Sequence, residues 1–484
     1  MRTEPARMTM RVASCLAVAI AALALAGCAG AADRKPAASA AETEPALAFT
    51  SVNVLPMTAG EPVLRDYSVL VENGRIAAVG PSASLPIPSH AVRIDGRGKY
   101  LMPGLADMHA HLEHFDGPEY LKLFLVHGVT MVRSMDGRPN ILDWKRQAAA
   151  GTLASPDIHT AGQVLDGSPP VRDDNLALAT PAEGRRAVEQ QAAAGYDFVK
   201  VYANLSAPTF QAIVQAAAAR NLPVAGHVPR AVPLDAFLAS GVASLEHLGD
   251  FADAIAAPPA SGAAAPAVLK RRLGFPADQG RMEALAAKVA ASRIRVVPTI
   301  VADDRLVAAA ADVERWMKDP EAAAVDRGIL NHYWRGTVSR GAERVGAANW
   351  RWVEQGKANR RNLLRALHRA GVPLLLGTDT PQPFVFPGAS VHDELANYVE
   401  AGLTPAQALA LATREPARFL RQHRNWGTVE PAKRANLLLL DANPLADIAA
   451  TRRIAGVVTG GRWLPVAELE RMRREVEAVA AASE

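Results

Sequence analysis

Short apolar runs alternate with amphipathic stretches through most of this 484-residue chain. Between about residues 101 and 424, eight apolar runs of strand length are separated by helical patterns such as TFQAIVQAAAARN. The runs lie near 102–108, 129–133, 157–161, 197–202, 222–227, 242–247, 294–300 and 372–378. Repeated strand–helix units predict an α/β fold, a (β/α)8 TIM barrel, because neighbouring parallel strands need a long crossover. A doubly wound sheet is the alternative, but it would not gather residues from both ends of the segment around one point.

Two flanking segments show strands without helices. In the first, Asn73-Gly74 separates two alternating apolar runs, which is a strong hairpin signal. In the second, after about residue 425, the runs NLLLLDA and AGVVTGGRWL also have strand character, with Gly460-Gly461 at the turn. A charged helical pattern follows from Val466 to Glu484, and we expect that helix to lie on the surface.

The N-terminal residues 1–28 have the pattern of an export signal, in which a basic start precedes an apolar run too short to span a membrane. The sequence LAGC that ends at Cys28 resembles a bacterial lipobox, which implies cleavage before this cysteine and its lipidation. An ordinary signal peptide with an incidental cysteine is the alternative. Because Ala29 is not Asp, we expect an exported lipoprotein anchored in the outer membrane and facing the periplasm. Residues 29–46 are Ala-rich and predict a linker.

Composition excludes several classes of function. The formal net charge is only +4, no basic block is present and aromatic residues make up 5% of the chain, so nucleic-acid binding has little support. Both cysteines, Cys15 and Cys28, lie in the export segment. A disulfide within the fold, a thiolate zinc site and a catalytic cysteine are therefore excluded. Composition leaves the oligomeric state open, including a homo-oligomer.

The first candidate chemistry lies in the sequence LMPGLADMHAHLEH. His109 and His111 are two residues apart, so on a strand their imidazoles face the same side. Neutral imidazole is the commonest protein ligand for metal ions. The alternative is a pair of polar residues on an exposed strand face. The metal interpretation gains weight only if further ligands follow on later strands.

Further ligands do follow, each at the end of a predicted strand. Lys200 lies in DFVKVY, His227 in LPVAGHV, His247 in VASLEHL and Asp379 in VPLLLGTD. The active sites of (β/α)8 barrels form at the carboxyl ends of the strands. The predicted barrel therefore brings these side chains to one end.

This order of HxH, Lys, His, His and Asp resembles the amidohydrolase superfamily, in its two-metal subtype with a carboxylated lysine. It is also similar to a prolidase-like and imidazolonepropionase-like branch, over most of the chain after about residue 47. The resemblance implies a small β-sandwich built from residues 47–102 and 425–465, a barrel at 103–424 and a separate C-terminal helix at 466–484.

The resemblance also assigns the ligands to two divalent metal ions, expected to be Zn²⁺: His109, His111 and Asp379 to one, His227 and His247 to the other, and Lys200 between them. A lysine ammonium beside two cations would be repelled. A carbamate formed from CO2 on Lys200 would be anionic and could bridge both ions. The alternative for this lysine is a side chain that reaches solvent or pairs with an acid.

Four further assignments concern catalysis and substrate binding. Asp379 is placed to move a proton from a metal-bridging hydroxide to the leaving group, and it could also cap a following helix. Tyr202 faces the same side as Lys200 and could bind an oxyanion or a substrate carboxylate, or pack in the barrel. Arg133 could bind an anionic substrate terminus or form a structural ion pair. His392 matches a position in similar proteins, where it lines the pocket, or it is structural.

Two insertions interrupt the barrel pattern. Residues 252–280 are rich in Ala, Pro and Gly, which predicts a loop or a lid. Residues 301–357 are long for one connection and carry aromatic residues that either cap the site or pack helices together: Trp316, Tyr333, Trp334, Trp350 and Trp352.

Together these features predict a binuclear hydrolase that attacks the amide bond of a dipeptide or an N-acyl amino acid with a bridging hydroxide. A lactonase, phosphotriesterase or carbamate hydrolase could use the same centre. A one-metal deaminase or imidazolonepropionase is a further rival, but it gives Lys200 no purpose, and deaminases of this superfamily usually have Glu where Arg230 lies. The alternative outside the enzymes is a lipid-anchored binding protein without catalytic activity.

Overall fold

The computed structural model describes residues 45–60, 63–258 and 265–482. The predicted export signal, the lipobox with Cys28 and nearly all of the predicted linker lie outside the described residues. The described residues form one compact unit. The boundaries between sandwich, barrel and final helix therefore stay predictions. Within the described ranges, no helix is long and apolar enough to cross a membrane.

The strands of the barrel lie close to their predicted positions. Two parallel sheets supply seven of them, in the order β6 (Leu105–Ala110), β7 (Val129–Ser134), β8 (Asp157–Thr160), β11 (Val199–Val201), β12 (Val224–Gly226), β13 (Ser244–Glu246) and β14 (Arg295–Val297). Two short strands, β9 (Leu165–Gly167) and β10 (Leu176–Leu178), extend the second sheet beside β11. Nearly every residue of these seven strands is buried, as expected for parallel strands covered on both faces.

Single backbone bridges join the two sheets and add the eighth segment of the barrel. They pair Ala161 with Phe198, Val296 with Leu374, and Ala110 with Thr380. The segment from Leu374 to Thr380 thus occupies the eighth position without forming a regular strand. These contacts connect all eight segments in a ring and agree with the predicted (β/α)8 barrel.

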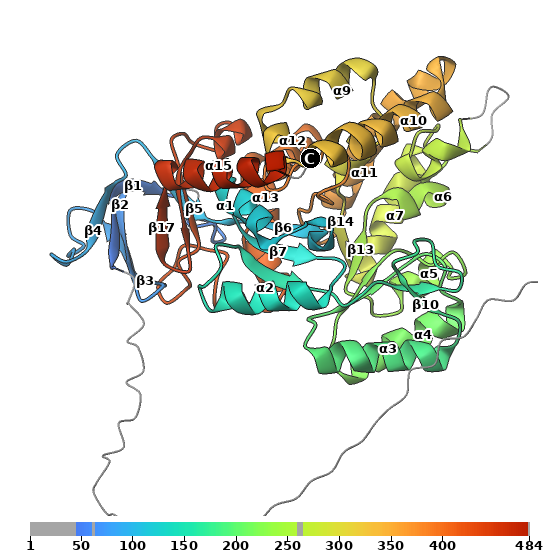
Figure 1. Ribbon diagram of the computed structural model, residues 1–484, viewed down its shortest axis with the longest axis horizontal. Coiled ribbons are helices and arrows are strands. Elements are labelled where there is room, and N and C mark those ends of the chain that lie inside the picture. Colours follow the sequence, from blue (N-terminus) through green and yellow to red (C-terminus); the bar gives the residue numbers. More distant parts are fainter. Residues whose placement is uncertain (1–44, 61–62, 259–264, 483–484) are drawn as a thin grey trace, which may run out of the picture. The chain divides into compact units, whose positions relative to one another are not determined.

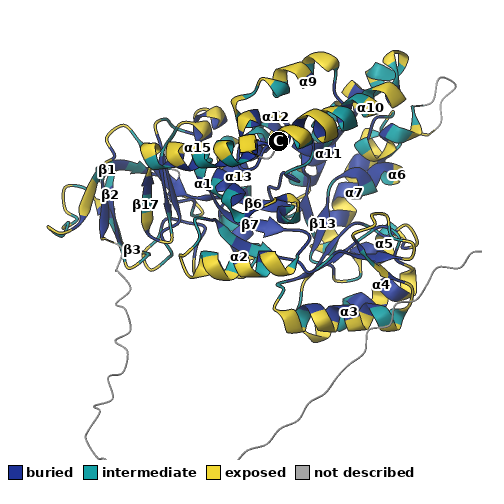
Figure 2. Cartoon of the chain, in the orientation of Figure 1, coloured by how far each residue is buried: buried dark blue, intermediate teal, exposed yellow. Residues whose placement is uncertain are grey.

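Helices follow the strands and surround them (Figure 1). Their bounds are α1 (Leu121–Val126), α2 (Pro139–Ala149), α3 (Pro181–Ala194), α4 (Ala207–Ala219), α5 (Leu234–Leu238), α7 (Gln279–Ser292), α11 (Trp350–Arg369), α12 (Ser390–Glu400), α13 (Pro405–Leu411) and α14 (Arg414–Phe419). Local sequence fixes their ends: α3 begins with a capping box between Thr180 and Glu183 and ends at Gly195 in the left-handed region. Figure 2 shows the result, with buried strands inside and exposed outer helix faces.

A separate sheet joins the two ends of the described chain. It has eight strands, namely β1 (Leu47–Val54), β2 (Leu64–Glu72), β3 (Arg75–Pro81), β4 (Val92–Asp95), β5 (Tyr100–Pro103), β15 (Leu437–Leu440), β16 (Ile454–Thr459) and β17 (Arg462–Pro465). The antiparallel pairing of β5 with β15 connects the early strands to the late ones. The prediction that both chain ends build one β domain is confirmed, and hydrogen bonds link all of its strands into one sheet.

Both predicted glycine turns are present in this sheet. Asn73 and Gly74, between β2 and β3, have φ values of +52° and +73°, as a type I′ hairpin turn requires. Gly460 and Gly461, between β16 and β17, have φ values of +58° and +92°. The two turns meet, because a Cβ on Gly461 would lie 2.4 Å from the Cα of Gly74. Glycine is therefore required here for space as well as for conformation.

The insertion after β14 is helical. It contains α8 (Ile300–Arg305), α9 (Ala310–Met317), the π-helix η6 (Ile329–Trp334) and α10 (Arg335–Val345). Trp316 and Trp334 pack on Phe384, with ring centroids 5.4 and 5.6 Å away. Trp350 and Trp352 pack against a separate apolar cluster. Helix packing, one of the two alternatives, thus accounts for these four tryptophans.

Two remaining segments complete the fold. The Ala/Pro/Gly-rich stretch contains α6 (Ala252–Ile255) and the 3₁₀ helix η4 (Ala267–Arg272) on either side of residues that are not described. The final helix, α15 (Val466–Ala482), is not merely superficial, because it buries Leu469, Met472 and Val476. This apolar face packs against α1 and attaches the helix to the barrel.

Candidate metal centre

The structure brings all six predicted ligands to one cavity. His109 lies near the end of β6 and His111 follows that strand. Lys200 lies in β11, His227 follows β12, His247 follows β13, and Asp379 lies in the eighth segment. All six line a cavity of about 290 Å³ at the carboxyl ends of the barrel strands. Strand direction explains this convergence, because parallel strands place their carboxyl ends at the same edge.

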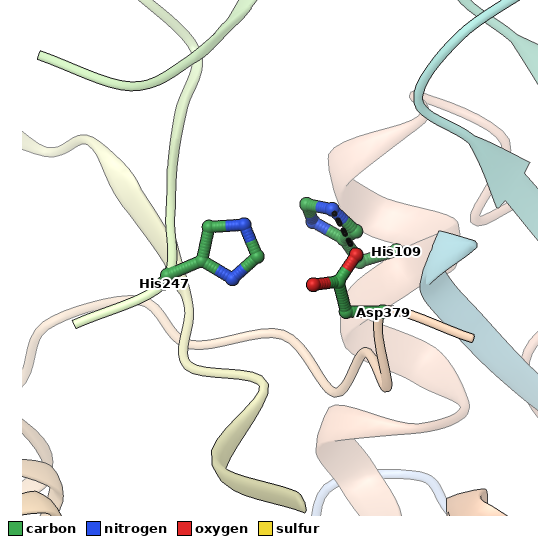
Figure 3. Close-up of side chains that lie close together, drawn as sticks. All are labelled: His109, His247 and Asp379. Carbon is green, nitrogen blue, oxygen red and sulfur yellow. Dashed lines mark ion pairs between the residues drawn. The ribbon is translucent and has the colours of Figure 1, made fainter. Parts of the chain in front are cut away.

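Three of these side chains form the tightest cluster. Single ligand atoms of His109, His247 and Asp379 all lie within 4.8 Å of one another. Figure 3 shows the two imidazoles and the carboxylate pointing toward a common space, and its dashed line joins His109 Nε2 to Asp379 Oδ1 at 3.3 Å. His111 Nε2 lies 3.2 Å from the same oxygen. The His227 ring is 4.9 Å from the His247 ring, so the fourth and fifth ligands are close by.

Two of these atoms test whether a metal ion fits. His109 Nε2 and Asp379 Oδ1 are buried, and neither has a hydrogen-bond partner in the described chain. The carboxylate of Glu246 accepts a hydrogen bond from His109 Nδ1, which leaves a lone pair on Nε2 of the neutral ring. Two acceptors that face each other in a buried site fit a shared cation. Imidazole and carboxylate are ligands that Zn²⁺ commonly takes.

Each histidine in the cluster presents its Nδ1 atom to a side chain that orients it. The distances are 2.7 Å from His109 to Glu246, 2.6 Å from His111 to Glu113, 3.3 Å from His227 to Asp250 and 2.5 Å from His247 to Thr299. Such partners fix the ring and leave Nε2 for a metal ion. Sequence reasoning missed all four partners. The only available signal was position, since Glu246, Asp250 and Glu113 lie within three residues of a histidine ligand.

Arg133 does not line the cavity. Its side chain is buried and donates to Glu246 Oε1 at 2.7 Å, to Met108 O at 2.7 Å and to Ser244 Oγ at 3.1 Å. Of the two alternatives that the sequence left open, Arg133 therefore forms the structural ion pair and does not contact a substrate in the cavity. Burial would raise the pKa of Glu246, but Arg133 and His109 hold it well below its usual range. Arg133 therefore keeps the partner of His109 ionised.

Burial also controls the protonation of the ligands. It lowers the pKa of Lys200 to about 8 and that of His227 to about 4. Burial acts in the same direction on His111, but Glu113 and Asp379 outweigh it and raise the pKa of His111 to about 10. The carboxylates of Glu113 and Asp379 thus place negative charge beside His111. Negative charge in a buried site favours a bound cation.

The backbone at two ligands is strained. His247 and Asp379 have φ values of +68° and +66°, in the left-handed region that favours glycine. Thr299, which contacts His247, has a φ value of +48°. Each such residue costs on the order of 1–3 kcal/mol. Left-handed conformations at two ligands and at a partner of one of them agree with a functional site at this end of the barrel.

The other two predicted site residues differ in their placement. Tyr202 lines the cavity, and its ring meets the His227 ring edge-on at 4.6 Å. His392 is buried in α12, where its Nδ1 atom lies 2.9 Å from Thr451 Oγ1. His392 does not line the cavity. Its position therefore agrees with a role in packing, and not with a role in catalysis or substrate binding.

Charged residues that the sequence did not single out complete the wall. Arg271 pairs with Asp250 at 2.6 Å. Arg172 and Arg272 also line the cavity, and neither side chain makes an ion pair or a hydrogen bond with the residues that the structure describes. The Nε atom of Arg272 is buried. Asp303 lines the same cavity.

Residues 100–464 match the model of the amidohydrolase family. The chain belongs to the amidohydrolase family. Among solved structures, bottromycin amidohydrolase superposes on this amidohydrolase with a TM-score of 0.70 and 27% identity, over 90% of each chain. A Xaa-Pro dipeptidase with bound methionine gives a TM-score of 0.62 at 19% identity, over 87% of this chain and all of the other, and it supports the fold alone.

Curated relatives match over shorter segments. An adenine deaminase of Chelativorans sp. (strain BNC1) is 30% identical over 220 residues, which is 41% of this chain and 34% of the relative. An imidazolonepropionase of Aromatoleum aromaticum (strain DSM 19018 / LMG 30748 / EbN1) is 41% identical over 71 residues, 14% of this chain and 17% of the relative. The match thus spans about a third or less of the length of these proteins.

Proposed function

We propose that this amidohydrolase is a metal-dependent hydrolase that cleaves an amide bond in a dipeptide or an N-acyl amino acid. The observation that carries the proposal is the convergence of six ligand side chains on one cavity, with His109 Nε2 and Asp379 Oδ1 facing each other at 3.3 Å. Similarity to bottromycin amidohydrolase over 90% of each chain supports an amide substrate.

The ligand set would hold two ions. His109, His111 and Asp379 would bind one, and His227 and His247 the other. Lys200 is buried in the wall of the same cavity, and a carbamate formed from its amine and CO2 would supply an anionic ligand shared by both ions. When bound, the ions supply Lewis acidity and lower the pKa of a coordinated water to roughly 7.

Two side chains of the chain itself would act on the substrate. The carboxylate of Asp379 faces the ligand histidines and can take a proton from the attacking water and donate it to the departing amine. The hydroxyl of Tyr202 lies in the wall beside His227 and can donate a hydrogen bond to the oxygen that gains charge. Together they supply a proton path and an oxyanion contact.

The charges in the wall favour a substrate with ionised ends. Arg172 and Arg272 offer two guanidinium groups that the described residues leave unpaired, and a guanidinium group binds a carboxylate well. Asp303 offers a carboxylate to an ammonium group. A dipeptide carries both groups, and an N-acyl amino acid carries the carboxylate. A neutral lactone or phosphotriester carries neither, which makes those rival activities weaker proposals.

Elemental analysis of chain purified without chelators tests this function first. We expect about two zinc or similar ions per chain and turnover on a panel of dipeptides and N-acyl amino acids. One ion per chain, together with conversion of adenine to hypoxanthine, would support a deaminase instead, as the names of the curated relatives suggest. No bound metal after addition of metal and bicarbonate would contradict both proposals and favour a binding role.

We also propose, from the sequence alone, that the protein is exported and anchored to the outer membrane through a lipid on Cys28. Fractionation of cells tests this proposal. A Cys28→Ser variant should leave the membrane fraction, and a variant that stays there would contradict the anchor.

A further inference from the structure

A second cavity, of about 230 Å³, lies beside the metal centre. We call it the apolar cavity, because its walls are mostly hydrophobic. The walls include Phe115, Tyr120, Val325, Ile329, Tyr333 and Trp334. None of these residues is a ligand or a partner of a ligand in the metal centre. The proposed reaction therefore leaves this cavity without a role.

Two short segments place the apolar cavity next to the metal centre. Gln382 lines both cavities, and its backbone N–H donates to the carbonyl oxygen of Asp379 at 3.0 Å. His114 lines the apolar cavity directly after Glu113, which lines the other one. Gln382 therefore lies between the ligand Asp379 and the hydrophobic walls along the chain, and it borders both cavities.

The sizes of the two cavities indicate one ligand rather than two. Their volumes are about 230 and 290 Å³. Pockets that hold a whole small molecule usually measure roughly 300–1,000 Å³. Each cavity alone is at or below the lower end of that range, whereas a ligand that spans both would fill a space of ordinary size. The apolar cavity then takes one side chain of that ligand.

The walls of the apolar cavity are already rigid. Trp334 is 1% exposed, and its ring packs against Phe384 and Phe386 with centroids 5.6 Å away. Tyr120 stacks on Phe115 at 5.7 Å. Such walls need no rearrangement to receive an apolar group, so its burial is not opposed by ordering of the pocket.

The π-helix η6 supplies Ile329, Tyr333 and Trp334 to the wall of the cavity, and helices of this kind are frequent at functional sites. Tyr333 in this helix lines the cavity and is 56% exposed, although large apolar side chains are usually covered. Two carboxylates, Asp116 and Asp326, also line the cavity. Asp326 is engaged by the backbone N–H of Ile329 at 2.8 Å, and Asp116 is exposed. Their charge opposes an acidic side chain.

We propose that the apolar cavity is the specificity pocket of this hydrolase and receives an apolar side chain, aliphatic or aromatic, next to the scissile amide bond. This inference rests on the proposed amide hydrolysis. It adds the class of side chain that the enzyme selects. Apolar pockets discriminate by roughly 10–200-fold for each methylene group they accommodate or lose.

Kinetics on matched substrates test the pocket. For N-acetyl amino acids and for dipeptides with glycine on either side, kcat/KM should be at least 10-fold higher with leucine or phenylalanine than with alanine. The aspartate substrates should be the poorest. A preference for lysine or arginine over leucine would overturn the inference, because the carboxylates and not the walls would then set specificity. Equal rates for alanine and leucine would also overturn it, while leaving amide hydrolysis intact.

A variant that fills the pocket gives the sharper test. Ile329→Phe should lower kcat/KM for phenylalanine substrates at least 10-fold and leave alanine substrates nearly unchanged. Ile87→Phe is the matched control, because Ile87 is also half-buried but lies in the small β domain. Val325→Ala should enlarge the pocket and shift the preference toward tryptophan. If neither variant at the pocket changes the order of substrates, the inference is wrong.

Binding of products gives a readout that does not depend on turnover. Titration calorimetry should show tighter binding of leucine or phenylalanine than of alanine to the wild-type enzyme, and Ile329→Phe should remove that difference. If the enzyme hydrolyses no amide but this selectivity holds, the proposed function fails and the pocket stands. If it hydrolyses alanine substrates but shows no such selectivity, the pocket fails and the function stands.

Discussion

Replacement of Glu246 by glutamine probes the side chain that links the ligand His109 to the rest of the barrel. The Glu246 carboxylate is fully buried and accepts from His109 Nδ1 at 2.7 Å, from Arg133 at 2.7 Å and from Ser244 Oγ at 2.6 Å. Glutamine keeps the shape but removes the charge and turns one acceptor into a donor. The guanidinium of Arg133 then loses its buried counterion.

The expected cost follows from those contacts. Removal of one partner from a buried ion pair usually costs about 3–5 kcal/mol, because the other charge stays buried. Loss of the partner that orients a ligand histidine typically weakens metal binding about 10–100-fold. Glu246→Gln should therefore lower the unfolding free energy of the metal-free protein by several kcal/mol and weaken zinc binding by at least 10-fold.

Denaturant unfolding without metal and zinc titration against a competing chelator measure the two effects. Because the folded-state pKa of Glu246 lies well below its ordinary value of 4.5, its stabilisation is present above pH 4.5 and is lost as the pH falls. The difference between wild type and variant should shrink on acidification. It should be largest near neutral pH.

Glu394→Gln is the control for a buried glutamate outside the metal centre. Glu394 is also fully buried, but it accepts from the backbone N–H groups of Ile300 and Val301 and contacts no ligand of the metal centre. Its substitution should leave zinc affinity unchanged. The reasoning is refuted if Glu246→Gln unfolds within about 1 kcal/mol of wild type and binds zinc within about twofold, or if Glu394→Gln weakens zinc binding equally.

Three further variants test separate steps. Lys200→Ala should reduce the metal content from about two ions to one per chain by elemental analysis, and full activity with two ions bound would refute the bridge. Asp379→Asn should lower kcat by about 10²–10⁴-fold while the protein keeps part of its metal, and wild-type turnover would exclude its proton transfer. Burial raises the pKa of Glu394 to about 8, so its contribution to stability falls as the pH rises from 4.5 to 8, by at most about 1.4 kcal/mol per pH unit. Glu394→Gln should flatten this pH dependence in denaturant unfolding, and an unchanged slope would contradict the raised pKa.

The positions of the barrel strands and of the ligand candidates follow from local pattern. Apolar runs of strand length predicted seven strands within a few residues, and the two-residue spacing of His109 and His111 placed both rings on one side. Asn73-Gly74 likewise fixed its hairpin through its own backbone preference. Such features depend on a few neighbouring residues, so they can be predicted from the local sequence.

The contacts that support the ligands could not be found in this way. Arg133 lies more than a hundred residues before its partner Glu246, and only the ring of strands brings them together. Thr299 reaches His247 because β13 pairs with β14. The resemblance suggested a pocket position for His392, but its helix turns the ring toward Thr451. These side-chain contacts depend on packing between elements that are distant in the sequence. The hydrophobic periodicity of one segment carries no information about such packing.

Metal binding should also stabilise the fold strongly, because the centre without metal is unfavourable in several ways. His247 and Asp379 have left-handed backbone conformations at about 1–3 kcal/mol each, Lys200 is desolvated, and His109 Nε2 lacks a hydrogen-bond partner among the described residues. Zinc at 1,000 times its dissociation constant adds about 4.1 kcal/mol to stability. Calorimetry should therefore show a higher Tm with zinc than with a chelator, and Asp379→Asn should reduce that increase. Equal Tm values, with zinc bound by elemental analysis, would show that the unfolded chain binds zinc as well as the folded chain does, and would contradict the prediction.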